Sequence, residues 1–531
     1  MTGKPDGAGA PQAADFARRI RTLGDIPGQH AQQHPERVAL RYRDTQLTFE
    51  QLDAVSNQLA NALIAEGFPP HARIAFLDRN SDAFFPILFG VSRAGLTLAT
   101  INFRLTAPEI AYILEDSDAE VIFVGRDYLE SVMAAQDGLS RPRKIIVIHG
   151  DTRAADSLAN WLGHHPLTSP DLDIRPESAA VQMYTSGTTG HPKGVELSHA
   201  SMISSAIEGL SVWPFLFKPD AAVLATMPLF HIAAANLCLA GLYAGARAEI
   251  LRDSTPAEII SLIAANGISI TPLPPALIHE IIRLPGLEAL DFSRLDTLLI
   301  GGSSIPVELL QQAQKALGCG FALSYGMTEC CGGLTYLGPE DCTHDAGQKL
   351  KSAGKPLANN RIRIVDPEGR DLPVGRTGEI LCKSDRVMTG YWRRPDATRE
   401  AIRDGWYHSG DAGYLDEEGY LYIVDRIKDM VISGGENIYP AEIENELARH
   451  PAVDEVAVIG LADPKWGERL HACIILKPGM APDEATLETF LRGKLAGYKI
   501  PRHYEFVEHF PRNATGKVLK RVMRSDRSAQ G

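Results

Sequence analysis

From Thr48 onward, apolar helical stretches alternate with short β-rich runs. LTFEQLDAVSNQLANALIAEG repeats apolar residues at helical spacing, whereas RIAFL (73–77) and EVIFVG (120–125) are compact runs rich in β-branched and aromatic residues. Such alternation is typical of βαβ units, in which helices connect parallel strands. We therefore predict an α/β fold with βαβ-type sheets in the large N-terminal part of the chain.

The pattern of the sequence changes near Arg361, where strand-like runs separated by turns replace the alternation of helices and strands. RIRIV, GEILCKS and YLYIVDR are strand-like runs separated by Gly, Pro and Asp turns, which predicts a smaller β-rich subdomain. Beyond Arg426, the helix-like AEIENELARH, the strand-like VDEVAVIG and the helix-like LETFLRGKLAG predict a small α+β unit of about 100 residues. We predict a flexible leader at 1–20, an N-terminal domain at 21–427 with the β-rich subdomain from about 361, and a C-terminal domain at 428–531.

Length and composition exclude several classes of protein. The 531 residues are too many for one hydrophobic core, and the net charge of −13 argues against nucleic acid as the main partner. The seven cysteines contain no C-x-x-C pair, and their scattered, odd count suits a reducing cytoplasm. The longest uncharged stretch, 230–246, falls short of a membrane span and predicts a buried helix instead. The sequence leaves open whether the chain forms homo-oligomers.

The run YTSGTTGHPKG (184–194) directly follows a short β-like segment. Its three glycines let backbone N–H groups approach an anion without interference from a Cβ atom. An ordinary solvated Ser/Thr/Gly turn has the same composition, and the run contains neither a Walker A pattern nor G-x-G-x-x-G. Alone, the run therefore predicts an anion cradle and leaves the ligand open.

Eight further motifs follow this run in order. They are PLFH (228–231), GGSSIP (301–306), SYGMTE (324–329), GEI (378–380), YHSGD (407–411), DRIKDM (425–430), GGENIYP (434–440) and PRNATGK (511–517). Each motif is weak alone, but in this order the chain resembles the adenylate-forming superfamily of acyl-CoA synthetases, peptide-synthetase adenylation domains and beetle luciferases, over nearly its whole length. The resemblance implies an ATP-dependent, AMP-forming acid–thiol ligase that uses ATP, Mg²⁺ and coenzyme A and has a small, mobile C-terminal domain.

The resemblance also implies which residues bind the nucleotide. The β- and γ-phosphates would be held by Thr185, Ser186, Gly187, Thr188, Thr189 and Gly190, with Lys193 adding a positive charge. In SYGMTE, Tyr325 would stack on adenine, Thr328 would contact the α-phosphate, and Glu329 would hold Mg²⁺, which prefers oxygen ligands. The rest of the nucleotide site would be Gly302, Ser303, Ser324 and Gly326.

The same resemblance implies three further charged residues that act in the first half-reaction. Asp411 would accept hydrogen bonds from both ribose hydroxyls, and Arg426 would add a second ribose or phosphate contact. Lys517 would be the catalytic lysine that bridges the attacking carboxylate and the α-phosphate. Each of these side chains alone is equally typical of a turn or a solvated surface, so the prediction rests on the joint order of the motifs.

The second half-reaction would use a rotated C-terminal domain, a motion of the hinge type. Lys428 stands at the hinge position of the family, three residues after Asp425. Gly434 and Gly435 would leave room for the thin pantetheine arm of coenzyme A, although the sequence GGEN is equally typical of an ordinary turn.

The segment after PLFH lines the acyl pocket in the family, with His231 at its mouth and in a catalytic role. Amino-acid-activating relatives usually carry Asp at that position, and acetate-specific relatives carry Trp where Gly326 stands, so we expect neither substrate. Cinnamate-type ligases often carry Tyr at the position of Ala233, which argues against a flat hydroxycinnamate. The predicted wall is small or apolar and offers no partner for a second carboxylate; its members are Ala233, Ala234, Leu237, Met327, Gly332, Gly333 and Leu334.

We therefore predict that the substrate is an apolar, fairly bulky carboxylic acid: a medium- or long-chain fatty acid, an aryl-alkanoic acid, or an alicyclic or steroid side-chain acid. Three alternatives stay open at the level of sequence. The adenylate could pass to a separate carrier protein, it could be oxidised by a luciferase-like monooxygenase, or the fold could serve a binding protein without catalysis.

Overall fold

The computed structural model describes residues 20–150, 155–185, 191–301, 305–343, 347–433, 436–492, 494–512 and 518–528. The chain divides into two compact units, Met1–Arg361 with Lys383–Ile402, and Ile362–Cys382 with Arg403–Gly531. The second unit contains the predicted C-terminal domain and most of the predicted β-rich subdomain, whose residues 383–402 belong to the first unit. The predicted boundary at 428 therefore lies inside it and stays a prediction.

The first unit contains an eight-stranded, mostly parallel sheet. Its middle strands are apolar throughout: RIAFL is buried at every position, as expected for a strand covered on both faces. The order is β21 (Gly390–Tyr391), β9 (Lys193–Ser198), β8 (Ala179–Thr185), β4 (Thr97–Thr100), β3 (Arg73–Leu77), β5 (Val121–Val124), β6 (Lys144–Val147) and β7 (Asp156–Ser157). Strands β8, β9 and β21 form an antiparallel edge.

A second, seven-stranded sheet of the first unit is also mainly parallel. The order is β14 (Gly320–Ser324), β13 (Thr297–Gly301), β12 (Ile270–Pro272), β10 (Ala222–Ala225), β11 (Arg247–Ile250), β1 (Val38–Tyr42) and β2 (Thr45–Thr48). Two short hairpin ladders follow β14, and they consist of β15 (Gly326–Met327) with β16 (Gly332–Gly333) and β17 (Thr335–Tyr336) with β18 (Lys355–Pro356).

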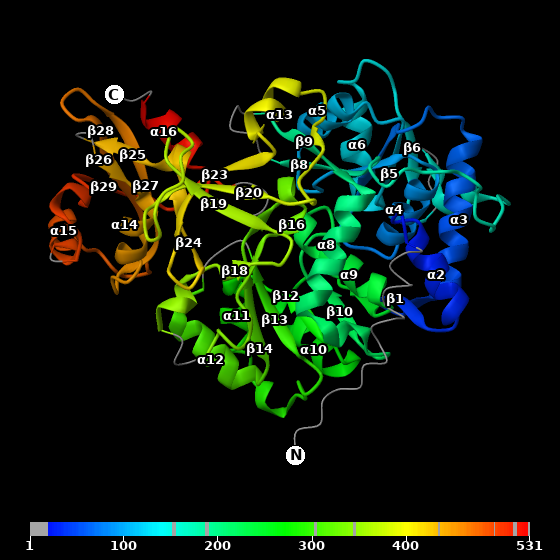
Figure 1. The fold of residues 1–531 in the computed structure, drawn as a ribbon, viewed down its shortest axis with the longest axis horizontal. Helices are drawn as coiled ribbons and strands as arrows, with labels where there is room; N and C mark the ends of the chain where they lie inside the picture. The colour runs from blue at the N-terminus through cyan, green and yellow to red at the C-terminus, as the bar shows by residue number, and fades with distance from the viewer. Residues whose placement is uncertain are drawn as a thin grey trace. The chain divides into compact units, whose positions relative to one another are not determined.

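Helices α8 (His199–Val212) and α9 (Ile232–Ala244) pack between the two sheets of the first unit (Figure 1). Helix α8 packs on β8 and β9, helix α9 packs on β10 and β11, and the two helices pack on each other. Helix α9 is apolar on nearly all sides, as expected for a helix between two layers, and it ends at Gly245, whose φ is 83°. The predicted buried helix is thus confirmed.

Some of the other helices of the first unit begin with a side-chain cap; Thr48, for example, forms a capping box with Gln51 at the start of α3. The other helices of this unit are α2 (Asp25–Gln33), α3 (Phe49–Ala65), α4 (Phe84–Arg93), α5 (Ala107–Ser117), α6 (Leu129–Gln136), α7 (Leu158–Leu162), α10 (Pro256–Asn266), α11 (Pro275–Ile281), α12 (Val307–Leu317) and α13 (Pro395–Ala401). None of the helices in the described part of the chain is long and apolar enough to cross a membrane.

The second unit contains two five-stranded sheets. The first consists of β19 (Arg361–Val365), β20 (Gly378–Lys383), β23 (Trp406–Leu415), β22 (Ile402–Arg403) and β24 (Leu421–Arg426). The second consists of β26 (Glu436–Ile438), β25 (Val431–Ser433), β28 (Gly467–Leu476), β27 (Val453–Asp463) and β29 (His503–Phe506).

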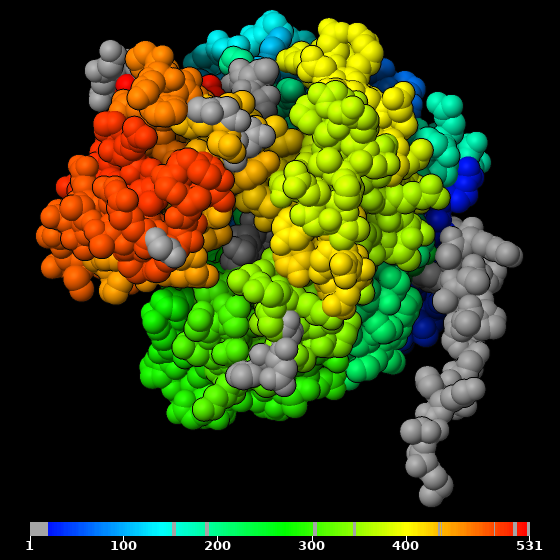
Figure 2. Space-filling model, turned by 60° about the vertical axis from the view of Figure 1, so that its left-hand side comes forward, coloured from blue at the N-terminus to red at the C-terminus, as the bar shows by residue number. Residues whose placement is uncertain are grey.

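Three helices accompany the second of these sheets, namely α14 (Pro440–Leu447), α15 (Glu484–Leu491) and α16 (Lys520–Ser528). Figure 2 shows the segments from β25 to α16, in orange and red, as one closely packed body. The predicted α/β class, with large βαβ-type sheets, a β-rich part and a small α+β C-terminal part, is confirmed.

Candidate functional site

The predicted phosphate loop connects β8 to β9. Thr185, the last residue of β8, lies opposite Lys193, the first residue of β9, in the antiparallel ladder. Strand β21 pairs with the other side of β9 and places Tyr391 opposite Val195. The middle of the loop, Ser186, Gly187, Thr188, Thr189 and Gly190, lies outside the described residues. The edge of the sheet therefore brings Thr185, Lys193 and Tyr391 together.

The carboxylate of Glu329 lies at the same edge. Thr185 donates a hydrogen bond from Oγ1 to Oε1 of Glu329 at 3.3 Å, and the Tyr391 hydroxyl donates to the same oxygen at 3.1 Å. Oε2 accepts no hydrogen bond from any described residue. The Lys193 ammonium lies 5.0 Å from the centre of the Tyr391 ring. A carboxylate oxygen suits Mg²⁺ and an ammonium suits phosphate oxygens, so these groups fit the predicted ligands.

The SYGMTE segment is fixed by backbone bonds to the strand that follows it. Leu334 donates its N–H to the carbonyl of Tyr325 at 2.7 Å, and Ser324 donates from Oγ to the carbonyl of Thr335 at 2.9 Å. Thr328 opens the 3-10 turn that carries Glu329. The structure thus places Ser324 through Glu329 in one continuous stretch, from the end of β14 through β15 into the 3-10 turn. Gly302 and Ser303 of the predicted adenine slot lie outside the described residues.

The predicted acyl wall includes a hairpin that only glycine can build. At Gly326 an added Cβ atom would overlap the carbonyl of Gly332, because β15 and β16 approach closely. Gly332 has a φ of 102°, and an added Cβ there would lie 3.1 Å from Nδ2 of Asn236. A side chain at Gly333 would overlap Oγ of Ser324. The absence of a side chain at Gly326 is therefore required by the backbone as well as useful for an open pocket.

Helix α9 is accessible along one narrow face near its start. Ala233 is exposed and Asn236, one turn later, is half-buried, whereas Ala234 and Leu237 are 1% and 2% exposed. Asn236 donates from Nδ2 to the carbonyl of Cys331 at 2.7 Å, so it joins the helix to the glycine hairpin. Asn236 was not among the predicted wall residues; its place three residues after Ala233 on a helix was the available signal.

His231 caps the start of α9 with extended backbone. Burial lowers the pKa of its imidazole to about 4, and the nearby Arg104 charge acts in the same direction. Its Nε2 atom is buried and has no hydrogen-bond partner among the described residues. His231 is therefore neutral at pH 7 and can offer a substrate a hydrogen bond without a charge.

A buried ion pair supports the glycine hairpin from behind. Arg386 and Glu208 are 1% and 3% exposed, and their charged groups lie 2.6 Å apart. The Arg386 guanidinium also donates to the carbonyl of Gly333 at 2.6 Å and to Oδ1 of Asn360 at 3.1 Å. The sequence did not reveal this pair, because an isolated Arg and Glu, well separated along the chain, usually lie at the surface.

Asp411 and Arg426 meet within the second unit. They are opposite residues of β23 and β24, and Nε of Arg426 lies 2.6 Å from Oδ1 of Asp411. Asp411 is 4% exposed, and its backbone N–H donates a hydrogen bond to Oγ of Ser409 at 3.0 Å. The structure thus brings together the two groups predicted to contact ribose.

The predicted hinge lies in the turn Ile427–Asp429, where Lys428 is exposed. Both neighbouring acids contact the C-terminal elements: Oδ2 of Asp425 accepts the N–H of Ala441 at 2.9 Å, and Oδ1 of Asp429 pairs with Arg524 at 2.9 Å. Gly434, Gly435 and Lys517 lie outside the described residues, so their predicted roles stay predictions.

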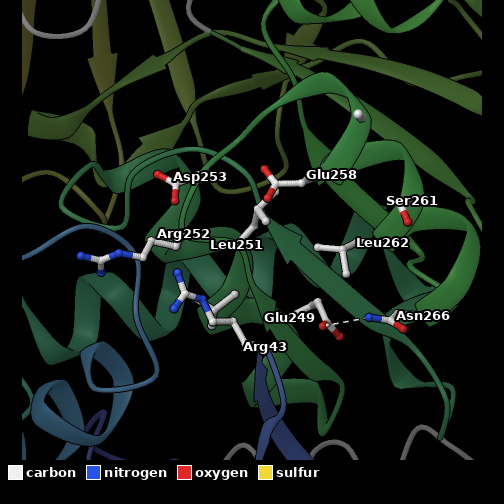
Figure 3. Close-up of a pocket in the computed structure, with 11 residues that line it drawn as sticks. Arg43, Glu249, Leu251, Arg252, Asp253, Glu258, Ser261, Leu262 and Asn266 are labelled. Atoms are coloured by element: carbon white, nitrogen blue, oxygen red, sulfur yellow. Dashed lines mark hydrogen bonds between the residues drawn. The ribbon is translucent and has the colours of Figure 1, made fainter. Parts of the chain in front are cut away.

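A hollow of about 480 Å³ (Figure 3) is lined by none of the predicted site residues. Its charges have both signs and are largely paired. Arg252 bonds to Asp127 at 2.6 Å, and Glu249 accepts a hydrogen bond from Asn266 at 3.0 Å. The hollow therefore presents no strong net charge that would select an ionic ligand.

His471, Cys473 and Glu505 have the spacing of metal ligands in the second unit. Glu505 is already paired with Arg527 through two contacts of 2.5 and 2.8 Å, and it accepts a hydrogen bond from His471 at 2.9 Å. Burial raises the pKa of the Cys473 thiol to about 12, so the thiolate needed by a metal is disfavoured. We interpret this group as an ion-pair cluster.

Comparison with known proteins agrees with this geometry. The sequence profile described as AMP-binding enzyme matches residues 28–392, and the one described as AMP-binding enzyme C-terminal domain matches residues 442–517. The chain is 39% identical to the fatty acid–[acyl-carrier-protein] ligase ScoC of Streptomyces coeruleorubidus, over 95% of this chain and 96% of that protein. It is 38% identical to a feruloyl-CoA synthase of an Amycolatopsis species, over 95% and 99% of the two chains.

A solved structure shows the same fold. It is the O-succinylbenzoate coenzyme A synthetase (MenE) of Bacillus subtilis in complex with ATP and magnesium ion, with a TM-score of 0.81, 29% identity and coverage of 94% of this chain and 98% of that one. The resemblance inferred from the order of motifs is thereby confirmed. The individual roles of the site residues stay predictions.

Proposed function

Because this chain belongs to the AMP-binding enzyme family, we propose that it activates an apolar, fairly bulky carboxylic acid with ATP and transfers the acyl group to coenzyme A. The class of reaction is ATP-dependent acid–thiol ligation with Mg²⁺ and coenzyme A. The finer part of the proposal is the substrate: a medium- or long-chain fatty acid, an aryl-alkanoic acid, or an alicyclic or steroid side-chain acid. We expect the enzyme to work in the cytoplasm and to have no nucleic-acid partner.

The chemistry assigned to the site is two displacements. The acid oxygen attacks the α-phosphorus of ATP and pyrophosphate leaves; the coenzyme A thiol then attacks the acyl carbon and AMP leaves. Lys193 and the loop from Thr185 would bind the phosphates, and Lys517 would steady the charge that develops at the α-phosphate. Mg²⁺ held by Glu329 would neutralise phosphate charge. His231, neutral at pH 7, would contact the acid by a hydrogen bond.

One observation supports the apolar acid above the others: the wall near Gly326 is built of glycine, and the charge behind it is already compensated. Arg386 reaches the carbonyl of Gly333, but Glu208 neutralises it at 2.6 Å. A second carboxylate on the substrate would find no uncompensated cation in the described part of this wall, and its desolvation would be costly. Exposed Ala233 leaves room for bulk on the helix side.

A second acceptor is a specific alternative. The ScoC relative is named for transfer to an acyl-carrier protein, whereas the Amycolatopsis relative is named for coenzyme A. Both acceptors end in the same phosphopantetheine thiol, so the adenylating half would be shared. No observation on the described residues favours a luciferase-like monooxygenase.

A panel of acids tests the proposal. Acids of graded length and ring size, together with matched dicarboxylic acids, are supplied with ATP and Mg²⁺, and AMP release is measured with coenzyme A, with a carrier protein and with neither thiol. We expect monocarboxylic apolar acids and coenzyme A to give the fastest release. Preference for a dicarboxylic acid would contradict the assignment of the wall, and release only with the carrier protein would establish the alternative acceptor.

A further inference from the structure

We propose that Tyr391 is a positioning residue that holds Glu329 and Lys193 apart, so that the carboxylate stays available for Mg²⁺ and the ammonium for phosphate. This inference rests on the proposed function, because it concerns the same nucleotide site. It starts from two contacts of one side chain: the hydroxyl bonds to Glu329 at 3.1 Å, and the ring lies 5.0 Å from the Lys193 ammonium.

The backbone of Tyr391 is fixed on both sides. Trp392 donates its N–H to the carbonyl of Gly194 at 2.8 Å, which continues the ladder between β21 and β9. The N–H of Tyr391 itself bonds to Oγ1 of Thr398 at 2.9 Å, and its carbonyl accepts the N–H of Arg394 at 3.0 Å. The side chain therefore starts from a position that the sheet edge and α13 determine together.

The same segment is tied to both ends of the phosphate loop. Arg394 pairs with Oδ1 of Asp116 at 2.7 Å, and Oδ2 of Asp116 accepts a hydrogen bond from the Tyr184 hydroxyl, just before the loop, at 2.9 Å. Just after the loop, the carbonyl of Pro192 accepts the hydroxyl of Tyr112 at 3.1 Å. The residues that flank the loop and the segment of Tyr391 are therefore connected through α5.

The charges explain why a tyrosine is suited to this place. A carboxylate and an ammonium so close to the same ring attract each other, and a direct ion pair would leave less charge for phosphate and metal. Among the described residues, no ion pair joins Lys193 to Glu329. The π-face of the ring attracts the ammonium, while the hydroxyl hydrogen-bonds the carboxylate. Tyr391 can thus satisfy both groups weakly and keep them separate.

Two substitutions separate these roles. In Tyr391→Phe the ring remains and the bond to Glu329 is lost, so we expect the Kd of ATP measured with Mg²⁺ to rise about ten- to a hundredfold, as one lost hydrogen bond to a charged group implies. The Kd of ATP measured without Mg²⁺ should change less than about twofold. In Tyr391→Leu the ring is lost too, and the Kd without Mg²⁺ should also rise.

The measurement is isothermal titration calorimetry of the full chain with ATP, without acid or coenzyme A, in the presence of Mg²⁺ or of EDTA. Tyr422→Phe on β24 is the matched control and should bind ATP as the wild type does, and thermal unfolding checks that each variant is folded. In a Glu329→Gln background, Tyr391→Phe should have a smaller effect, because the amide oxygen that remains is an uncharged acceptor.

Three results would decide against the inference. Equal weakening by Tyr391→Phe with and without Mg²⁺, or no weakening at all, would show that the hydroxyl does not act through Glu329. An undiminished effect in the Glu329→Gln background would lead to the same conclusion. Failure of the wild-type chain to bind ATP would instead overturn the proposed function together with this inference.

Discussion

Replacing Arg386 by methionine removes one half of the buried ion pair behind the predicted acyl wall. Glu208 is 3% exposed and would keep only the N–H of Asn359 at 2.9 Å and the side-chain amide of Asn360 as donors. The carbonyl of Gly333 would also lose its donor at 2.6 Å. The substitution therefore leaves a carboxylate uncompensated in the interior of the first unit and loosens the hairpin that forms the wall.

The expected magnitude follows from burial. Breaking a buried pair by removing one partner typically costs about 3–5 kcal/mol, because the remaining charge is unpaired in a poor solvent. An exposed pair gives the contrast: Arg370 and Glu368 have side chains 72% and 63% exposed, and such pairs contribute about 0–1 kcal/mol. The double variant Arg386→Met/Glu208→Met removes both charges and should recover most of the loss.

Hydrogen exchange of α8, the helix that carries Glu208, gives the local free energy of opening without assuming that the two units unfold together. We expect Arg386→Met to lower it by several kcal/mol and to raise KM for the acid, while Arg370→Met changes neither. If Arg386→Met stays within about 1 kcal/mol of the wild type, or if the double variant is less stable than the single one, the buried pair does not have the role assigned to it.

The remaining predictions concern the backbone, the pH and the predicted catalytic lysine. Gly326→Ala should abolish adenylation, because its Cβ atom would overlap the carbonyl of Gly332; ATP–pyrophosphate exchange at the wild-type rate would contradict this. Lys517→Ala should abolish that exchange while leaving thioester formation from supplied acyl-adenylate largely intact. Burial lowers the pKa values of His30, His199 and His231 from 6.5 to about 4. Between pH 4 and pH 6.5 the unfolded chain therefore binds more protons than the folded chain, so the urea concentration at the midpoint of unfolding should fall as the pH drops from 6.5 towards 4. Replacing one of these histidines by Gln should make this fall less steep, and an unchanged slope would refute the assignment.

The order of motifs, through the resemblance to the family, was enough to name Thr185, Lys193 and Glu329 as candidates, because each stands in a short, recognisable run of sequence. Tyr391 was not predicted. Its contact with Glu329 spans 62 residues and depends on the pairing of β21 with β9, which no local pattern specifies. The bond between Asn236 and the carbonyl of Cys331 is a similar case, because it depends on how α9 packs against a hairpin of glycines.

Two sets of opposite charges in the first unit are arranged differently, in a way that fits the tasks proposed for them. Arg386 and Glu208 are in direct contact and fully buried, which removes net charge from the wall that would face an apolar acid. Lys193 and Glu329 are separated by a tyrosine, which leaves both able to bind charged ligands.

In the second unit, Asp411 and Arg426 are in direct contact at 2.6 Å, although both are predicted to contact ribose. A carboxylate has two oxygens, so Oδ2 of Asp411 can accept a ribose hydroxyl while Oδ1 keeps the arginine. Arg426→Lys, which retains a charge but not the fork geometry, should therefore weaken ATP binding less than Asp411→Asn does. The reverse order, measured by the same calorimetric titration, would mean that the arginine itself makes the dominant contact with the nucleotide.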